Sequence, residues 1–340
     1  MTEAPPPTEP AETVAQHVGL AFAPVLNAGR DVVAARRAHY LGHFTGKICD
    51  FGLDVLHEVA ATPARARRLR GTCQLNGRLL AAAVEELDED LRGMMSGALI
   101  RTVVHGDRGA FSCADIVPGR HVVGLVLDRA DESSLARQPA VVACDRAVSD
   151  LVTGQRGLLS LGSQNPGGTD QEQADDDQRP GTGGAQKVHV ERGAPSSPIP
   201  PEVVGAAELL FNAVIAPTDV HYLALCADGV PALSVDCLDH DDVSRFFTQI
   251  GVDERRTFLR SFTRSVPSIV ERLTRITAAV TGSQVLRLVL DVESGAIYYY
   301  RLSRDVFLIG VTLDQDQVGT ADRKVADVAV RCRALPELSD

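Results

Sequence analysis

The stretch DCLDHDD gathers side chains that could bind a metal ion: Cys237, Asp239 and His240, followed by Asp241 and Asp242. Thiolate, imidazole and carboxylate groups are zinc ligands, and a bound zinc ion can activate water for hydrolysis. Consecutive residues at the start of a helix point in different directions, however, and acidic side chains there cap free amides. We therefore expect helix capping, and keep a metal-dependent hydrolase using this region as the alternative.

The triplet HYL occurs twice, at His39 and at His221. Histidine can act as a base near neutral pH. In the hydrolase alternative, His221 would join Cys237 and His240 in the active site. Neither histidine has a recurrent acid or nucleophile near it in the sequence. Each is expected to be a structural histidine on a strand.

No further catalytic motif is found in the sequence. GHFTGKI places only three residues between Gly42 and Gly46, and Ile48 stands where a phosphate-binding loop needs Ser or Thr, so we expect a hairpin turn. The seven cysteines are scattered and never spaced C-x-x-C, which indicates reduced thiols. We expect no catalytic residues, no cofactor and no metal.

Charge and composition exclude some classes of partner. The net charge is −11 and the pI near 5.3, which opposes binding to nucleic acid or to an anionic membrane. The beginning of the chain lacks the basic and apolar pattern of a secretory signal, and the apolar runs are shorter than the roughly 18 residues of a membrane span. A soluble, cytoplasmic protein is expected.

An internal repeat is the most informative pattern in the chain. GAFSCADIVPGRHVVGLVLD (109–128) matches GAIYYYRLSRDVFLIGVTLD (295–314) at an offset of 186 residues. Extended back to residues 98 and 284, the match has seven identities, where chance would supply about two. DRAVSD (145–150) and DRKVAD (322–327) also correspond after a shift in spacing. The HYL triplets precede the two blocks at similar distances, so they are corresponding positions of one duplicated unit.

The repeat predicts two copies of one domain. We expect a disordered tail (1–11), the first copy (12–153), a disordered linker rich in Gly, Pro, Ser, Gln and Asp (154–202), and the second copy (203–335). Each copy is predicted as helix, two strands, helix, three strands and helix, starting with a helix at 12–28 in the first. In the second copy, Asp228-Gly229 indicates a hairpin turn, Gly251 a break between helical segments, and Pro267 a kink or restart.

This order of elements, with its D-G hairpin and its three-strand block before a final helix, resembles the roadblock family, relatives of dynein light chains and of bacterial regulators of Ras-like GTPases. The resemblance implies an α+β fold of two roadblock-like (profilin-like layered) domains, each a five-stranded antiparallel-type sheet with helices on its faces. It also implies pairing through sheet edges, within the chain as a pseudo-dimer or between chains as a homodimer.

Two groups of residues are candidates for binding a partner. Tyr298, Tyr299 and Tyr300 alternate on a strand, where packing under a helix competes with an interface patch. Arg65, Arg67, Arg68 and Arg70 form a basic cluster, either a solvated helical face or a docking site for an acidic partner, with Arg65, Arg67 and Arg68 as the candidate docking residues. We expect a noncatalytic regulatory or scaffold protein whose partners include a small Ras-like GTPase. A chaperone-like module for a secreted or assembling partner is a further alternative.

Overall fold

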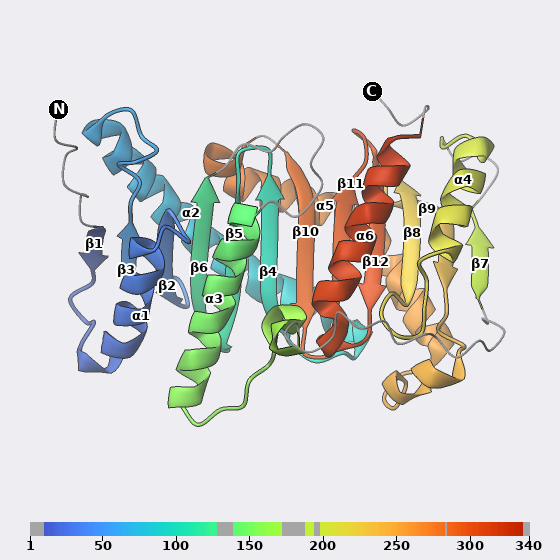
Figure 1. Cartoon of the computed structure of the whole chain (residues 1–340), viewed down its shortest axis with the longest axis horizontal. Coiled ribbons are helices and arrows are strands. Elements are labelled where there is room, and N and C mark those ends of the chain that lie inside the picture. Colours follow the sequence, from blue (N-terminus) through green and yellow to red (C-terminus); the bar gives the residue numbers. More distant parts are fainter. Residues whose placement is uncertain (1–9, 128–138, 172–187, 194–197, 283, 336–340) are drawn as a thin grey trace, which may run out of the picture.

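The computed structural model describes residues 10–127, 139–171, 188–193, 198–282 and 284–335. Its strands form one twelve-stranded antiparallel sheet in the order β1-β3-β2-β6-β5-β4-β10-β11-β12-β8-β9-β7 (Figure 1). The strands of the first half are β1 (Ala11–Val14), β2 (Tyr40–Thr45), β3 (Ile48–Asp54), β4 (Leu99–Gly106), β5 (Gly109–Val117) and β6 (Arg120–Leu127). Those of the second half are β7 (His189–Arg192), β8 (Tyr222–Ala227), β9 (Val230–Asp236), β10 (Val285–Val292), β11 (Gly295–Arg301) and β12 (Val306–Thr312).

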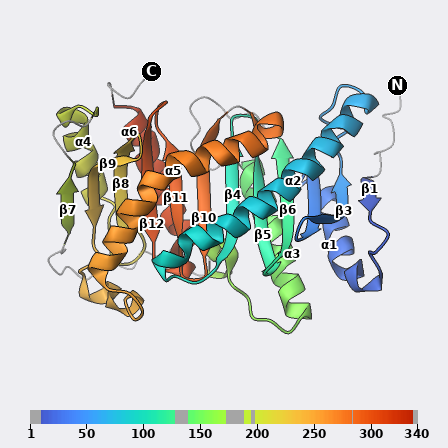
Figure 2. The same ribbon diagram turned by 180° about the vertical axis from the view of Figure 1, so that it is seen from behind.

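Helices cover both faces of this sheet. One face carries α1 (Ala23–Ala34), α3 (Pro139–Leu158), α4 (Pro201–Asn212) and α6 (Val318–Arg333) (Figure 1). The opposite face is crossed by two long helices, α2 (Pro63–Leu91) and α5 (Val252–Thr281) (Figure 2). Short 3-10 helices are η1 (Leu20–Phe22), η2 (Arg92–Met94), η3 (Pro166–Gln171), η4 (Asp241–Phe246) and η5 (Gln315–Gln317). Among the described helices, none is both long and apolar enough to cross a membrane.

The expectation of two roadblock-like domains, each with its own five-stranded sheet, is wrong. β4 of the first half pairs antiparallel with β10 of the second, with Val103 opposite Val289, so the strands of both halves belong to one sheet. An edge strand leaves a row of backbone N–H and C=O groups without partners, and pairing the two edges satisfies both rows. Every residue of β4 is buried. The broader expectation of an α+β protein agrees with the structure.

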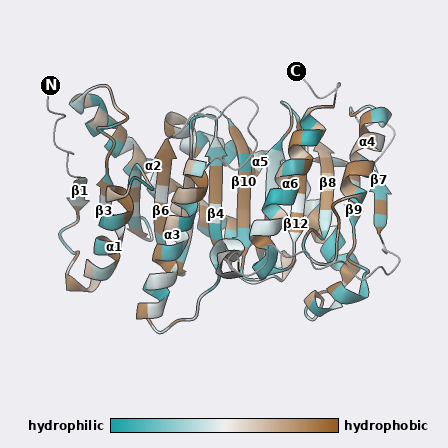
Figure 3. Ribbon diagram, in the orientation of Figure 1, coloured by the Kyte–Doolittle hydropathy of each residue, from teal (hydrophilic) through white to brown (hydrophobic). Residues whose placement is uncertain are grey.

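The strands predicted in the two repeated blocks are present and keep the same register. Arg101 lies opposite Ala114 in the first block, and Arg287 lies opposite Tyr300 in the second. Apolar residues from both halves join in one core cluster across the β4–β10 seam, and the central strands are largely apolar in Figure 3. The last position of the first block, residue 128, lies outside the described residues.

Several predicted boundaries differ from the structure. The helix predicted at 12–28 is replaced by β1, η1 and α1, which begins only at Ala23 with Pro24 in its first turn, where a missing amide donor is tolerated. Gly251 does precede α5, but this helix continues past Pro267 to Thr281 as a single element.

Parts of the segments expected to be a tail and a linker form regular elements. β1 begins at Ala11, α3 extends to Leu158, and β7 pairs with β9 at an edge of the sheet. Residues 1–9, 172–187 and 194–197, which belong to those same segments, lie outside the described residues.

Candidate functional site

The two HYL histidines occupy the same structural position in the two halves. The Nδ1 atom of His39 accepts a hydrogen bond from the backbone N–H of Leu127 at 3.1 Å, and that of His221 accepts one from Leu313 at 3.1 Å. The two leucines are again 186 residues apart. Burial lowers the pKa of His221 to about 4. Both histidines immediately precede a strand, β2 or β8, instead of lying on it as predicted, but each binds the backbone at the end of a neighbouring strand, which fits the expected structural role.

The DCLDHDD stretch does not form a metal site. Cys237 is buried with its Sγ 3.8 Å from the carbonyl oxygen of His221, whereas Asp239 binds Arg256 at 2.5 Å. The Nδ1 atom of His240 accepts the N–H of Asp242, so His240 caps η4 where acidic side chains were expected to do so. Cys237, Asp239 and His240 thus have separate structural contacts, and the hydrolase alternative has no assembled site here.

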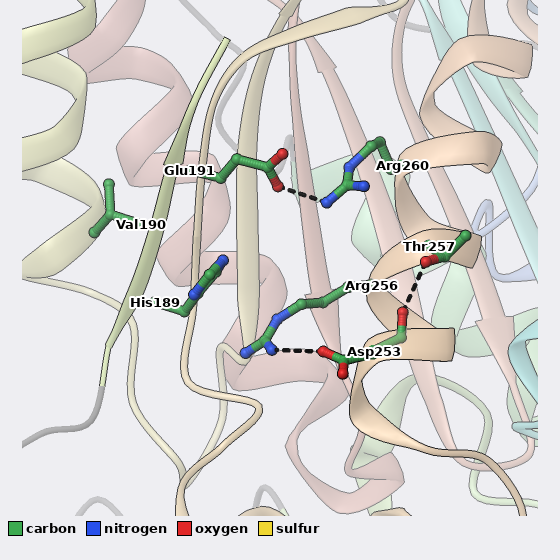
Figure 4. A pocket seen from close by; sticks show the side chains of 7 residues that line it. All are labelled: His189, Val190, Glu191, Asp253, Arg256, Thr257 and Arg260. Atoms are coloured by element: carbon green, nitrogen blue, oxygen red, sulfur yellow. Dashed lines mark hydrogen bonds and ion pairs between the residues drawn. The ribbon is translucent and has the colours of Figure 1, made fainter.

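A pocket of about 390 Å³ lies beside this region, between β7 and the first turns of α5 (Figure 4). Its charged side chains are paired with one another: Glu191 binds Arg260 at 2.6 Å, and Arg256 lies 3.5 Å from Asp253. Arg256 also binds the buried Asp236 at 2.7 Å. Arg256 therefore serves the fold through the buried Asp236, whereas Arg260 pairs with Glu191 at the surface.

The tyrosine triplet lies inside the molecule. Tyr298 and Tyr300 have no exposed surface and Tyr299 has 5%, so the alternative of an interface patch is wrong. The hydroxyls of Tyr298 and Tyr300 donate to the Val318 carbonyl oxygen at 2.8 Å and to Asp322 at 2.7 Å. These acceptors belong to α6, which covers Tyr298 and Tyr300, so the alternative of packing under a helix agrees with the structure.

Buried ion pairs occupy the seam between the two halves. Arg101 on β4 binds Asp145 of α3 and, at 2.9 Å, Asp291 of β10. The corresponding Arg287 on β10 binds Asp322 of α6 at 2.5 Å. Burial opposes the charge on Arg101, but the two carboxylates outweigh burial and raise its pKa. Asp145 and Asp322 begin the matched DRAVSD and DRKVAD segments, so the repeat already contained the signal for these pairs.

Three arginines of the predicted basic cluster lie on the exposed side of α2, whereas the fourth, Arg70, pairs with the buried Asp54. Arg65, Arg67 and Arg68 are exposed, and two to three turns further along the same helix Leu75 and Leu79 keep 45% and 42% of their surface exposed. We call these five residues the α2 surface. All five residues belong to the first half, where the sequence pattern of helices and strands is weaker than in the second half.

A cluster that the sequence analysis missed lies on the β5–β6 hairpin. The Cys113 sulfur, an Asp115 carboxylate oxygen and a His121 ring nitrogen all lie within 4.8 Å of one another. His121 Nδ1 is 2.5 Å from Asp115 Oδ1, and its Nε2 is 3.4 Å from Glu85 Oε1 of α2. The signal was available, because Cys113 and Asp115 are two residues apart on one strand and therefore share a face, and His121 follows a short turn.

The electrostatics of this cluster follow from burial and hydrogen bonding. Burial opposes protonation of His121, but its bonds to Asp115 and Cys113 prevail and raise its pKa to about 11. Burial raises the pKa of Cys113 and of Asp115.

Comparison with known proteins gives no relative: no family model, no curated protein and no solved structure matches the chain.

Proposed function

We propose that this chain is a noncatalytic scaffold that binds a protein partner through the α2 surface. The observation that carries the proposal is the exposure of Leu75 and Leu79 on a helix that also presents Arg65, Arg67 and Arg68. Exposed apolar side chains bordered by charged ones are typical of protein interfaces, and Arg is enriched there.

The second half provides an internal comparison for this surface. The offset of 186 residues also relates α2 to α5, because Arg70 binds Asp54 and the corresponding Arg256 binds Asp236. At this offset, Leu75 and Leu79 become Ser261 and Ser265, and Arg67 and Arg68 become Asp253 and Glu254. The fold therefore accepts polar residues where α2 has leucine, which supports a role for the leucines outside the fold.

Charge complementarity indicates the chemistry of the partner. The chain is acidic overall, with a net charge of −11, so a cluster of three arginines is a local exception. It suits a partner with acidic residues beside an apolar patch, since opposite potentials steer association and fix orientation. A small Ras-like GTPase is the partner class that the sequence resemblance favours.

The test compares two double variants of the full-length protein. Leu75→Ser/Leu79→Ser gives α2 the residues of α5, whereas Ser261→Ala/Ser265→Ala changes the corresponding positions of the second half. Each protein is used to capture partners from lysate of the source organism with a GTP analogue, with GDP or without nucleotide. A captured protein is then purified, and its affinity for each variant is measured by calorimetry.

The proposal expects a purified partner that binds wild type and the α5 variant equally, and binds the α2 variant at least about tenfold more weakly, as for the loss of two apolar contacts. Stronger binding in the presence of the GTP analogue would assign the GTPase class. Equal binding by all three proteins would refute the role of the α2 surface.

A further inference from the structure

We propose that Cys113, Asp115 and His121 bind a zinc ion on the β5–β6 hairpin beneath α2. This inference is independent of the partner proposal, because it rests on residues of the hairpin and on Glu85, none of which belongs to the α2 surface.

The hairpin places the three side chains on one face of the sheet. Cys113 and Asp115 are two residues apart on β5 and share a face, since successive side chains of a strand alternate. Asp115 is the direct cross-strand partner of His121 on β6, which fixes carboxylate and imidazole next to each other. The pairing of β5 with β6 on either side of a tight turn thus fixes the positions of all three side chains.

The types of ligand select the metal. A thiolate, an imidazole and a carboxylate form a zinc set, whereas magnesium and calcium prefer oxygen ligands alone. The three ligand atoms are within 4.8 Å of one another, so small side-chain shifts bring them to zinc bond lengths of about 2.0 to 2.3 Å. Three protein ligands leave a fourth position for water.

Glu85 supplies a supporting contact. With His121 Nδ1 on the metal side beside Asp115, the opposite nitrogen Nε2 faces Glu85 at 3.4 Å. Zinc-binding histidines usually donate their second N–H to a carboxylate, which orients the ring. The Glu85 and Asp115 side chains are 49% and 20% exposed, so the ion can reach the cluster from their side.

A cysteine nucleophile activated by His121 and Asp115 is the competing explanation of the same residues. Cys113 has no exposed surface, and an attacking sulfur must reach its substrate. A metal ion needs only to enter between the ligands. The burial therefore favours metal binding over nucleophilic catalysis.

The second half shows that the fold does not need this polar group. The corresponding residues are Tyr299, Arg301 and Phe307, and the rings of Tyr299 and Phe307 pack at 5.3 Å. An aromatic pair thus fills the place that cysteine and histidine fill in the first half. Apolar packing is sufficient at these positions of the sheet. The presence of cysteine and histidine there in the first half therefore favours a bound ion.

The test measures zinc directly in the full-length protein. The protein is stripped with a chelator, dialysed with zinc and analysed by elemental mass spectrometry, and cobalt is titrated as a spectroscopic substitute. The variants are Cys113→Ala and His121→Phe, the latter introducing the residue of the second half. Cys144→Ala, which removes another buried thiol of the same half, is the matched control.

The proposal expects about one zinc per wild-type and Cys144→Ala chain, and loss of stoichiometric zinc in Cys113→Ala and His121→Phe. Cobalt should give a thiolate-to-metal charge-transfer band in the wild-type protein, a readout that does not depend on how well a variant folds. Glu85→Gln, a positioning variant, should bind zinc about 10- to 100-fold more weakly. Absence of stoichiometric zinc together with absence of the cobalt band, or zinc retained by both ligand variants, would overturn the proposal.

Discussion

The buried pair of Arg287 on β10 and Asp322 on α6 allows a quantitative test of how a buried ion pair stabilises the second half next to the seam. Both side chains are 4% exposed, and Nη2 of Arg287 lies 2.5 Å from Oδ2 of Asp322. Substitution Arg287→Met keeps most of the side-chain volume but removes the cation. Asp322 then keeps the hydroxyl of Tyr300, 2.7 Å from its Oδ1, as a donor.

The expected cost follows from removing the cation that neutralises a buried carboxylate. Breaking a buried ion pair by removing one partner costs about 3 to 5 kcal/mol. Since Tyr300 still donates to Asp322, we expect the lower end, about 3 kcal/mol, for Arg287→Met. The double variant Arg287→Met/Asp322→Leu removes both charges and should lose less stability than Arg287→Met alone, because apolar replacement of a whole buried pair is often neutral.

Urea unfolding followed by circular dichroism measures these free energies of unfolding. Arg36→Met is the control, because Arg36 and Glu58 form an ion pair whose side chains are 38% and 36% exposed. Exposed pairs contribute about 0 to 1 kcal/mol. The reasoning is refuted if Arg287→Met costs no more than Arg36→Met, or if the double variant is less stable than the single one.

Two further predictions concern the histidine and glycine positions. The pKa of His221 is lowered to about 4, so the unfolded chain binds its proton first as the pH falls below the ordinary value near 6.5, and stability should decrease between these two pH values. His221→Asn, which keeps an acceptor for the N–H of Leu313, should flatten that decrease in urea titrations at pH 4 to 7; an unchanged slope would contradict the assignment. Gly295 has φ 111°, and a Cβ there would lie 2.1 Å from the Thr312 carbonyl oxygen, so Gly295→Ala should destabilise the protein by about 1 to 3 kcal/mol. Gly205→Ala, where a Cβ on α4 meets no other atom, should stabilise the protein by up to about 1 kcal/mol. Equal changes in melting temperature for the two variants would contradict the reasoning from Cβ contact and φ.

Alternation and repetition made much of the local structure predictable. The repeated blocks contained the three strands of each half, and the similar spacing of the HYL triplets before these blocks placed His39 and His221 at corresponding positions. The matched segments around Asp145 and Asp322 were recognised as corresponding, but the buried ion pairs that these residues form with Arg101 and Arg287 became visible only in the packed structure.

The pairing of the two halves could not be predicted from those patterns. The alternation of side chains along a strand predicts which residues share a face of the sheet. It does not predict which two edge strands will pair with each other. The burial of Tyr298 and Tyr300 likewise depends on α6 lying over them, and His121 meets Cys113 only across a hairpin turn. These features come from contacts between elements.

Hydrogen exchange of the backbone amides in β4 and β10 tests the single sheet most directly. Residues 99–106 and 285–292 form a central pair, so their amides should exchange as slowly as those of β5 and β11. Rapid exchange of both strands, at the rate of the edge strands β1 and β7, would contradict the continuous sheet on which the account rests.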